Sequence, residues 1–292
     1  MKTVTMMSHS EHFTERLRQR WIIHQAGGTR ARLARWSIMP WLILQRLGLN
    51  TWTTAPLFFG GRMRVLTGEQ LSRDILAFGY SELALTALML KVIRPGMRVI
   101  DVGAHFGYET LLASKLVGQT GRVVSFEPQP AVFSVLTDNL LSVKNARAVN
   151  AAVGACTGTV QMEAVDFLQS MFAGVAKHEN SQERVLLTTL DGALLPHERP
   201  VDFLKCDVEG HEMKVLAGAA DILKTDQPLL VLEAEMPAAD RPRVREFSNL
   251  LAPLGYRSLM FDYDGALRTG DVRPGHANVA FVPERFEASM ML

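Results

Sequence analysis

Short apolar runs rich in β-branched residues alternate along the chain with segments whose apolar residues recur at helical spacing. The runs predict buried strands at residues 98–100, 122–126, 146–151, 201–205 and 229–232. The helical spacing predicts helices at residues 82–93, 108–116, 131–141 and 212–223. This alternation predicts an α/β domain with a mainly parallel sheet and helices on both faces. Two later runs, 256–261 and 277–282, predict a closing C-terminal β-hairpin.

The segments outside this alternation carry weaker patterns. Residues 158–165 alternate like an extra strand, whereas residues 166–184 show no clear period and predict a functional or disordered loop. Residues 1–55 are predicted to form a basic N-terminal extension, and residues 56–292 to form the main domain.

The net charge of +1 hides an uneven distribution of charged side chains. Residues 1–50 contain eight Lys and Arg against Glu11 and Glu15, a local charge of +6, so the rest of the chain carries −5. An acidic body argues against a nucleic-acid-binding surface. The basic segment, which contains Trp36 and Trp41, has two interpretations. We favour a helix packed against the main domain over a peripheral contact with anionic lipid, because Pro40 interrupts the apolar face.

Two cysteines, Cys156 and Cys206, lie far apart and lack the spacing of a metal site or a disulfide framework. The N-terminus lacks the apolar core of a secretory signal, and no apolar stretch reaches the length of a membrane span. We therefore expect a cytoplasmic protein, peripheral to the membrane only if the N-terminal segment binds lipid. The oligomeric state is left open.

The junction between the first strand and its helix carries the most informative motif, Asp101-Val-Gly-Ala-His-Phe-Gly107. Gly103 and Gly107 permit a tight turn and a close backbone approach, and the helix N-terminus favours a polar ligand group. Glu127, at the end of the second strand, is placed to accept hydrogen bonds from ribose hydroxyls. Asp101 stands where a dinucleotide-binding turn has its first glycine, and its charge repels pyrophosphate but attracts an ammonium or sulfonium. These features predict S-adenosylmethionine (SAM) as a cofactor; the alternative is a turn that binds no ligand.

A second cluster of ionisable side chains lies at the end of the strand predicted at residues 201–205. Lys205, Asp207, Glu209 and His211 fall within seven residues at the carboxyl end of a central strand, where open α/β sheets bind their ligands. Four ionisable groups in so short a segment are costly to arrange unless they are paired or functional. The segment is therefore either an acceptor or catalytic site, or a salt-bridged turn before a helix.

Together the two motifs resemble the FkbM family of SAM-dependent methyltransferases. The matching strings are 99–109, 125–128, 150–154, 188–191 and 204–212, with 79–82 and 94–96 upstream. The resemblance covers roughly residues 57–283. It implies a Rossmann-like class I methyltransferase fold, and commonly O-methylation of a hydroxyl on a sugar, a natural product or a lipid-linked intermediate. His105 departs from the family, which often has asparagine there, and His211 stands where a small residue is common.

The resemblance also implies a set of cofactor-binding residues, taken by position in the matching strings: Glu82, Asp101, Gly103, Ala104, His105, Gly107, Glu127, Pro128, Asn150 and Ala151. Within this set, the glycine loop receives the methionine end and Glu127 the ribose hydroxyls. Asn150 and Ala151 lie near the adenine, and Glu82 helps to hold the ammonium group.

Methyl transfer to a hydroxyl needs a group that takes the hydroxyl proton, or a metal ion that favours its loss. His211 is the first candidate base because histidine titrates near neutral pH, and Asp207 and Glu209 are next. Lys205 completes the candidate catalytic set. Asp207 and Glu233 end adjacent strands and are candidate ligands of a Mg²⁺ ion that binds the acceptor.

Several alternatives stay open at this point. They are an N-methyltransferase acting on a small molecule, a nucleotide-dependent dehydrogenase, an aminopropyltransferase, and a non-catalytic SAM-binding protein with an N-terminal anchor. The expected partner is a small-molecule or glycan acceptor, whose identity the sequence does not specify.

Overall fold

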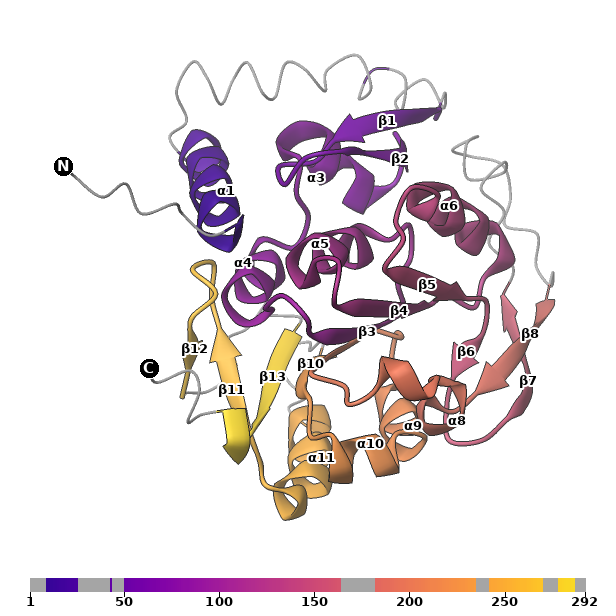
Figure 1. Ribbon diagram of the computed structural model, residues 1–292. Helices are drawn as coiled ribbons and strands as arrows, with labels where there is room; N and C mark the ends of the chain where they lie inside the picture. Colours follow the sequence, from indigo (N-terminus) through magenta and orange to yellow (C-terminus); the bar gives the residue numbers. More distant parts are fainter. Residues whose placement is uncertain are drawn as a thin grey trace.

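The computed structural model describes residues 9–25, 43, 50–163, 182–234, 242–269 and 278–286. Its main sheet consists of β3 (Arg98–Val102), β4 (Arg122–Phe126), β5 (Ala146–Val149), β9 (Phe203–Cys206), β10 (Leu229–Glu233), β11 (Tyr256–Phe261), β12 (Leu267–Arg268) and β13 (Asn278–Pro283). These eight strands lie in the order β12-β11-β13-β10-β9-β3-β4-β5 (Figure 1). The strands from β10 to β5 run parallel, and β13, β11 and β12 extend the sheet by antiparallel pairing. The predicted mainly parallel sheet and the antiparallel pairing of the two C-terminal strands are confirmed.

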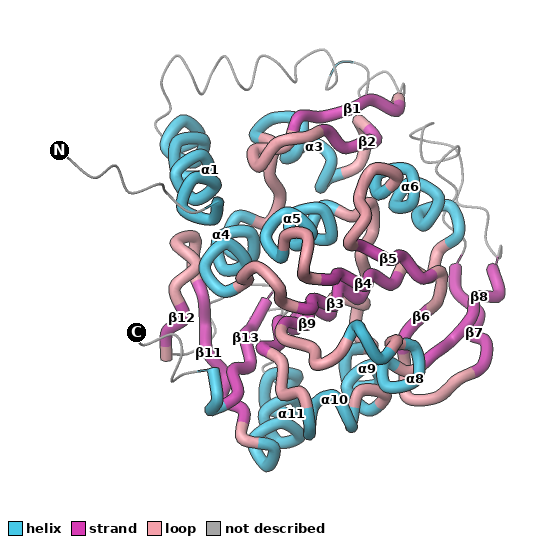
Figure 2. Tube along the Cα trace, viewed as in Figure 1, coloured by secondary structure: helices cyan, strands magenta, loops and turns pink. Residues whose placement is uncertain are grey.

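Helices cover both faces of this sheet (Figure 1 and Figure 2). One face carries α4 (Leu83–Val92), α5 (Tyr108–Val117) and α6 (Pro130–Leu140). The other carries α8 (Leu190–Ala193), α9 (Glu212–Ala217), α10 (Ala220–Thr225) and α11 (Pro242–Leu251), with single 3₁₀ turns at η1 (Pro196–Glu198) and η2 (Ala252–Leu254).

Successive residues of the central strands divide between two apolar cores. Val99 and Phe203 belong to the core beneath α4 and α5, which we call the first core, whereas Ile100 and Leu204 belong to the second core beneath α9 and α10. Because side chains alternate across a strand, both faces are buried. Burial on both faces explains why these strands read as nearly continuous apolar runs.

The first core extends into the N-terminal part of the chain. There α1 (His9–Gln25), the hairpin of β1 (Trp52–Pro56) and β2 (Arg62–Leu66), and α3 (Gln70–Phe78) lie over the helices of that face (Figure 1). Phe13 and Leu17 of α1 are buried in the first core. The hairpin, α3 and α11 had no counterpart among the predicted elements.

The N-terminal helix is also held by a polar contact, because the guanidinium of Arg20 donates a hydrogen bond to the carbonyl of Phe78. The division of the chain at residue 55 stays a prediction, and its boundary falls inside β1. Trp36, Pro40 and Trp41 lie outside the described residues, as does most of the segment for which lipid contact was considered.

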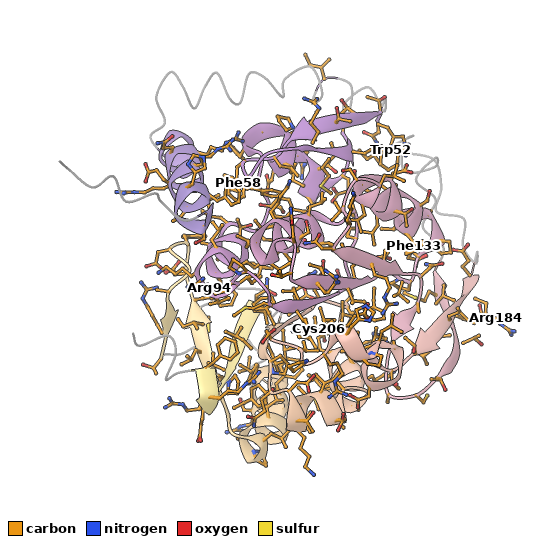
Figure 3. The ribbon with its side chains drawn as sticks, in the orientation of Figure 1. Trp52, Phe58, Arg94, Phe133, Arg184 and Cys206 are labelled. Carbon is orange, nitrogen blue, oxygen red and sulfur yellow. The ribbon has the colours of Figure 1, made fainter. Side chains whose placement is uncertain are left out.

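A smaller three-stranded sheet, in the order β6-β8-β7, flanks the main one. It is formed by β6 (Ala152–Val153), β7 (Gly158–Glu163) and β8 (Gln182–Thr188). The extra strand predicted near residue 158 is therefore confirmed. The loop predicted at 166–184 is wrong at its end, because residues 182–184 pair antiparallel with β7, while residues 164–181 are not described. Arg184 projects at the outer margin of this sheet (Figure 3).

The helix predicted at residues 212–223 is two short helices, α9 and α10. Gly218 ends the first, and its amide donates to the carbonyls of Lys214 and Val215. A Cβ at this position would lie 2.0 Å from the carbonyl oxygen of Gly154, so the chain turns where only glycine fits. Two predicted strands also differ at their ends, since β5 stops at Val149 and β9 begins at Phe203.

No single helix in the described ranges has the length and apolar composition of a membrane span. Among the described helices, one pair has this length and composition when its members are taken together: Leu71–Phe78 and Leu83–Val92, which are bent by 69° from each other.

Candidate functional site

Charged and polar side chains interrupt the apolar pattern at one edge of the main sheet. Asp101 of β3 and Lys205 of β9 are Cα partners in neighbouring strands, and Glu233 of β10 pairs with Asn278 of β13. All four occupy positions in phase with residues of the first core, so they project toward the face covered by α4 and α5. The predicted edge therefore includes one strand, β13, that runs antiparallel to the others.

Lys205 is the electrostatic centre of the site. It is 4% exposed, and its Nζ donates a hydrogen bond to the carbonyl of Gly103 at 2.9 Å. The same Nζ lies 3.5 Å from a carboxylate oxygen of Asp101 and 3.5 Å from one of Asp207. Burial favours the neutral amine, but the surrounding carboxylates outweigh burial and raise the pKa of Lys205 well above its ordinary value. The next residue, Cys206, turns to the second core near the middle of the molecule (Figure 3).

Asp101 has a second partner in the helix that follows its strand. The hydroxyl of Thr110 in α5 donates to Asp101 at 2.6 Å. Between them, Thr110 and Lys205 hold a carboxylate that is 1% exposed. Asp101 is thus held in place by other residues of the protein. The motif at residues 101–107 did not indicate these contacts.

The glycine loop packs against the chain itself. Gly103 has φ +78°, and a Cβ there would lie 1.8 Å from the carbonyl oxygen of Asp207. Gly107 has φ +91°, and a Cβ there would lie 2.5 Å from Leu136. Between the glycines, Ala104 is buried, and its amide and that of Gly103 donate to a carbonyl of β4. The glycines are therefore required by close packing of the loop, a reason additional to the ligand approach that the sequence suggested.

Glu127 fixes the same loop from the end of β4. Its Oε2 accepts a hydrogen bond from the amide of His105, and its Oε1 accepts one from the amide of Gln129, both at 3.0 Å. His105 itself has φ +50°, and its ring stacks on Phe106 at a centroid distance of 4.0 Å. Burial raises the pKa of Glu127, although the two amides oppose this effect. Each carboxylate oxygen keeps a free lone pair, so Glu127 can still accept from ligand hydroxyls.

Asn150 binds the backbone of the residues that follow β4. Its Nδ2 donates to the carbonyls of Glu127 at 2.8 Å and Pro128 at 3.0 Å. Ala151, the next residue, is buried. The side chain of Asn150 therefore lies beside Glu127 and Pro128, and the assignment of Asn150 and Ala151 to the adenine stays a prediction.

Glu82 reaches the site from the residue before α4. It has φ 38° and ψ 66°, a left-handed conformation unusual for a residue with a side chain. Its Oε2 accepts a hydrogen bond of 3.0 Å from Nδ2 of Asn278. Burial raises the pKa of Glu82, partly offset by the charge of Lys205.

The acidic end of the site combines residues from β10 and from the loop after β9. One carboxylate oxygen each from Asp207, Glu209 and Glu233 lies within 4.8 Å of the others. Burial raises the pKa of Glu233 to about 8, reinforced by a hydrogen bond with Asp207. The raised pKa favours the protonated form of Glu233, whose side chain is hydrogen-bonded to Asp207.

The remaining predicted residue, His211, is exposed at the start of α9 and makes no capping hydrogen bond with its side chain. The buried neighbour Glu212 instead accepts from the amides of Val208 at 3.2 Å and Gly210 at 3.0 Å. The turn is therefore held by Glu212. Asp207 lies close to both Lys205 and Glu209, and His211 does not belong to this group of described side chains.

Two residues that the sequence did not single out complete the site. Glu109, in the first turn of α5, is 5% exposed, and burial raises its pKa to about 8. Asn278 begins β13. Glu109 stood within a matching string, and its polar character on a buried helix face was the available signal. The sequence around Asn278 carried no signal, because its hydrogen-bond partner Glu82 lies far away along the chain and comes close only when the sheet forms.

Among the described residues of this region, four buried polar atoms have no hydrogen-bond partner: His105 Nδ1, Glu109 Oε1, Glu233 Oε2 and Asn278 Oδ1. A fifth atom, Asp101 Oδ1, has the ion pair with Lys205 but no hydrogen bond. Buried polar atoms are nearly always satisfied in proteins, so such a concentration indicates a place for a polar ligand. A groove of about 900 Å³ lies elsewhere, at the opposite sheet edge, and is lined by residues such as Leu57, Lys115, Arg122 and Asn145. None of the predicted site residues lines it.

Comparisons with known proteins agree on the kind of domain. The sequence profile of the methyltransferase FkbM domain matches residues 101–258, more than half of the chain. No curated protein sequence matches.

The solved structures that match this chain are distant in sequence. The crystal structure of methyltransferase FkbM from Methylobacillus flagellatus is 16% identical, with a TM-score of 0.45 over 66% of this chain and 50% of that one. Fibrillarin from Aeropyrum pernix, with natively bound SAM, is 17% identical, with a TM-score of 0.41 over 68% and 74%. A SAM-dependent O-methyltransferase from Thermotoga maritima is 15% identical, with a TM-score of 0.40 over 78% and 76%. This chain thus spans half the length of the Methylobacillus protein that it matches.

Proposed function

Because this chain belongs to the FkbM family of methyltransferases, we propose that it transfers a methyl group from SAM to a hydroxyl of a small-molecule or glycan acceptor. The observation that carries the proposal is a concentration of buried polar atoms that have no hydrogen-bond partner among the described residues. They lie at the sheet edge that also carries Lys205, the glycine loop and Glu127. An oxygen acceptor is favoured over an amine because the site holds several carboxylates that can take a hydroxyl proton.

The residues around the glycine loop fit SAM by their chemistry. Glu127 has lone pairs for the ribose hydroxyls, and the acidic surroundings of Asp101 and Glu82 suit a cationic methionine end. Asn150, which the family resemblance assigns to the adenine, donates to the carbonyl of Glu127. When bound, SAM supplies an electrophilic methyl group on a positively charged sulfur.

Asp207 is the residue that we assign as proton acceptor. One of its carboxylate oxygens lies 3.5 Å from Lys205 Nζ, and its side chain is hydrogen-bonded to Glu233. An acceptor hydroxyl that approaches this pair can pass its proton to Asp207 while Glu233 keeps its own. His211 stays a candidate base, and its exposure makes it the second choice.

A divalent cation such as Mg²⁺ is the second candidate feature of this edge. Asp207, Glu209 and Glu233 would hold it, since hard cations prefer carboxylate oxygens, and it would act as a Lewis acid on the acceptor oxygen. A proton on Glu233 competes with cation binding. Turnover should therefore depend on pH differently if a cation is bound than if Asp207 acts alone as the proton acceptor.

The decisive experiment incubates the protein with methyl-labelled SAM and fractionated cell extract, and identifies the labelled product by mass spectrometry. Fragmentation of that product distinguishes O-methylation from N-methylation. A protein that binds SAM yet labels no fraction would favour the non-catalytic alternative, and one that does not bind SAM would refute the proposal.

With the acceptor identified, Asp207→Asn should lower turnover by about 10²-fold or more while leaving SAM affinity nearly unchanged. Asp264→Asn is the matched control, because Asp264 is an exposed carboxylate paired with Arg268 on the turn between β11 and β12. His211→Ala should have a smaller effect than Asp207→Asn; the reverse order would assign the base to histidine. Loss of turnover on adding a chelator, restored by Mg²⁺, would establish the metal.

A further inference from the structure

Asn278 lies between the acidic residue Glu233 and the predicted cofactor-binding residue Glu82. It is the first residue of β13, its Cα partner is Glu233, and its position is in phase with Ala280 and Val282 of the first core. Its side chain therefore lies on the face that also carries Lys205. A strand outside the parallel part of the sheet thus contributes a side chain to the predicted cofactor region.

The amide of Asn278 has a defined orientation. Nδ2 donates to Glu82 Oε2 at 3.0 Å, so the carbonyl oxygen is the atom directed elsewhere. That oxygen, Oδ1, is buried, and no described residue forms a hydrogen bond with it. An amide oxygen is only an acceptor, so the missing partner must be a donor.

Glu82 supports the same conclusion from the other side of the contact. It holds a left-handed backbone conformation, which in proteins is concentrated at ligand-binding and active sites. Its electrostatic neighbours are Lys205, Asp207 and Asp101, which surround the glycine loop. With Glu109, four carboxyl groups interact electrostatically with Lys205, so the acidic surroundings favour a further cation nearby.

We propose that Asn278 joins Glu82, to which the family resemblance already assigns the ammonium group, in binding the amino group of the methionine end of SAM, so that β13 takes part in selecting the cofactor. A protonated amine has three N–H donors and no acceptor, which matches an amide oxygen beside a carboxylate. The inference rests on the proposed function, because it assumes that SAM is the cofactor. It assigns Asn278 to cofactor binding and leaves acceptor binding to Asp207 and Glu233.

Calorimetric titrations with SAM and with 5′-methylthioadenosine test this assignment, because methylthioadenosine keeps the nucleoside but lacks the amino-acid end. Asn278→Ala should weaken SAM binding by about tenfold or more and change methylthioadenosine binding by less than about twofold. Asn145→Ala is the matched control. It removes an amide that donates to the carbonyls of Ser114 and Gly118 near the start of β5, and it should change neither affinity.

The ratio of the two affinities within one variant is insensitive to the fraction of protein that is folded. An equal loss for both ligands would show a merely structural role, and unchanged SAM affinity would place Asn278 on the acceptor side; either result overturns the assignment. If Asn278→Ala does not fold, Asn278→Leu supplies the same test, since it roughly keeps the volume and removes the amide acceptor. A wild-type protein that binds neither ligand would instead refute the proposed SAM dependence.

Discussion

Replacement of Glu127 by alanine removes a side chain with two roles in this structure. The carboxylate is 6% exposed and accepts hydrogen bonds from the amides of His105 and Gln129, both at 3.0 Å. It therefore joins the end of β4 to the loop between β3 and α5. In the proposed function it also accepts the two ribose hydroxyls of SAM.

The two roles predict losses of different size. Hydrogen bonds to a charged group contribute about 1.5–3 kcal/mol each, so two lost amide contacts, partly replaced by water, should lower the free energy of unfolding by about 2–4 kcal/mol. Two lost ribose contacts of the same strength correspond to a decrease in SAM affinity of about 10²-fold to 10⁴-fold, because 1.4 kcal/mol is about tenfold. We expect the lower end of this range for Glu127→Ala, where water can enter.

The assay pairs SAM titration calorimetry with denaturant unfolding, at a temperature where circular dichroism shows the variant to be folded. Glu198→Ala is the control, because Glu198 is 3% exposed and binds Arg147 and the amide of Leu195 away from the glycine loop. That control should lose stability and keep SAM affinity. A folded Glu127→Ala protein with the SAM affinity of the wild type would refute the assignment of Glu127 to the ribose.

Three further outcomes are expected. Gly103→Ala should lower the free energy of unfolding by at least about 2 kcal/mol, because its φ is +78° and the new Cβ would meet the Asp207 carbonyl; unfolding equal to the wild type would show that the loop can shift. Burial raises the pKa of Glu109 to about 8, above its unfolded value, so this group stabilises the ligand-free protein fully only at low pH. Its contribution is lost as pH rises toward and through about 8, and Glu109→Gln should flatten this part of the melting-temperature profile; an unchanged slope would contradict the assignment. Deletion of residues 1–50 should lower the unfolding midpoint, because Phe13 and Leu17 leave the first core; if stability is kept while sedimentation with anionic vesicles disappears, the segment is a lipid anchor instead.

The sequence by itself determined the features that depend on near neighbours in the chain. The apolar runs at β3, β4 and β10 specified buried strands, and the glycines at 103 and 107 specified the loop between β3 and α5. The contact of Glu127 with that loop was foreseeable too, because a right-handed βαβ unit brings the ends of consecutive parallel strands together. In each case a short stretch of chain contains the residues that satisfy one another.

Other parts were hidden because their partners lie far along the chain. Residues 182–184 read as loop until β8 pairs with β7, and Gly218 divides a helix because the carbonyl of Gly154 lies against it. Hydrophobic period shows which side chains share a face but not which strand lies beside another. Local pattern therefore could not place these elements.

Only the tertiary structure decided how the candidate site is completed. The register of β3 with β9 sets Lys205 beside Asp101, and the insertion of β13 next to β10 sets Asn278 between Glu233 and Glu82. Strand order and register follow from burying both faces of the whole sheet at once, a sum over long-range contacts that no local segment contains. The sequence by itself determined the ionisable residue types and their phase along each strand, and the packed sheet decided which of them meet.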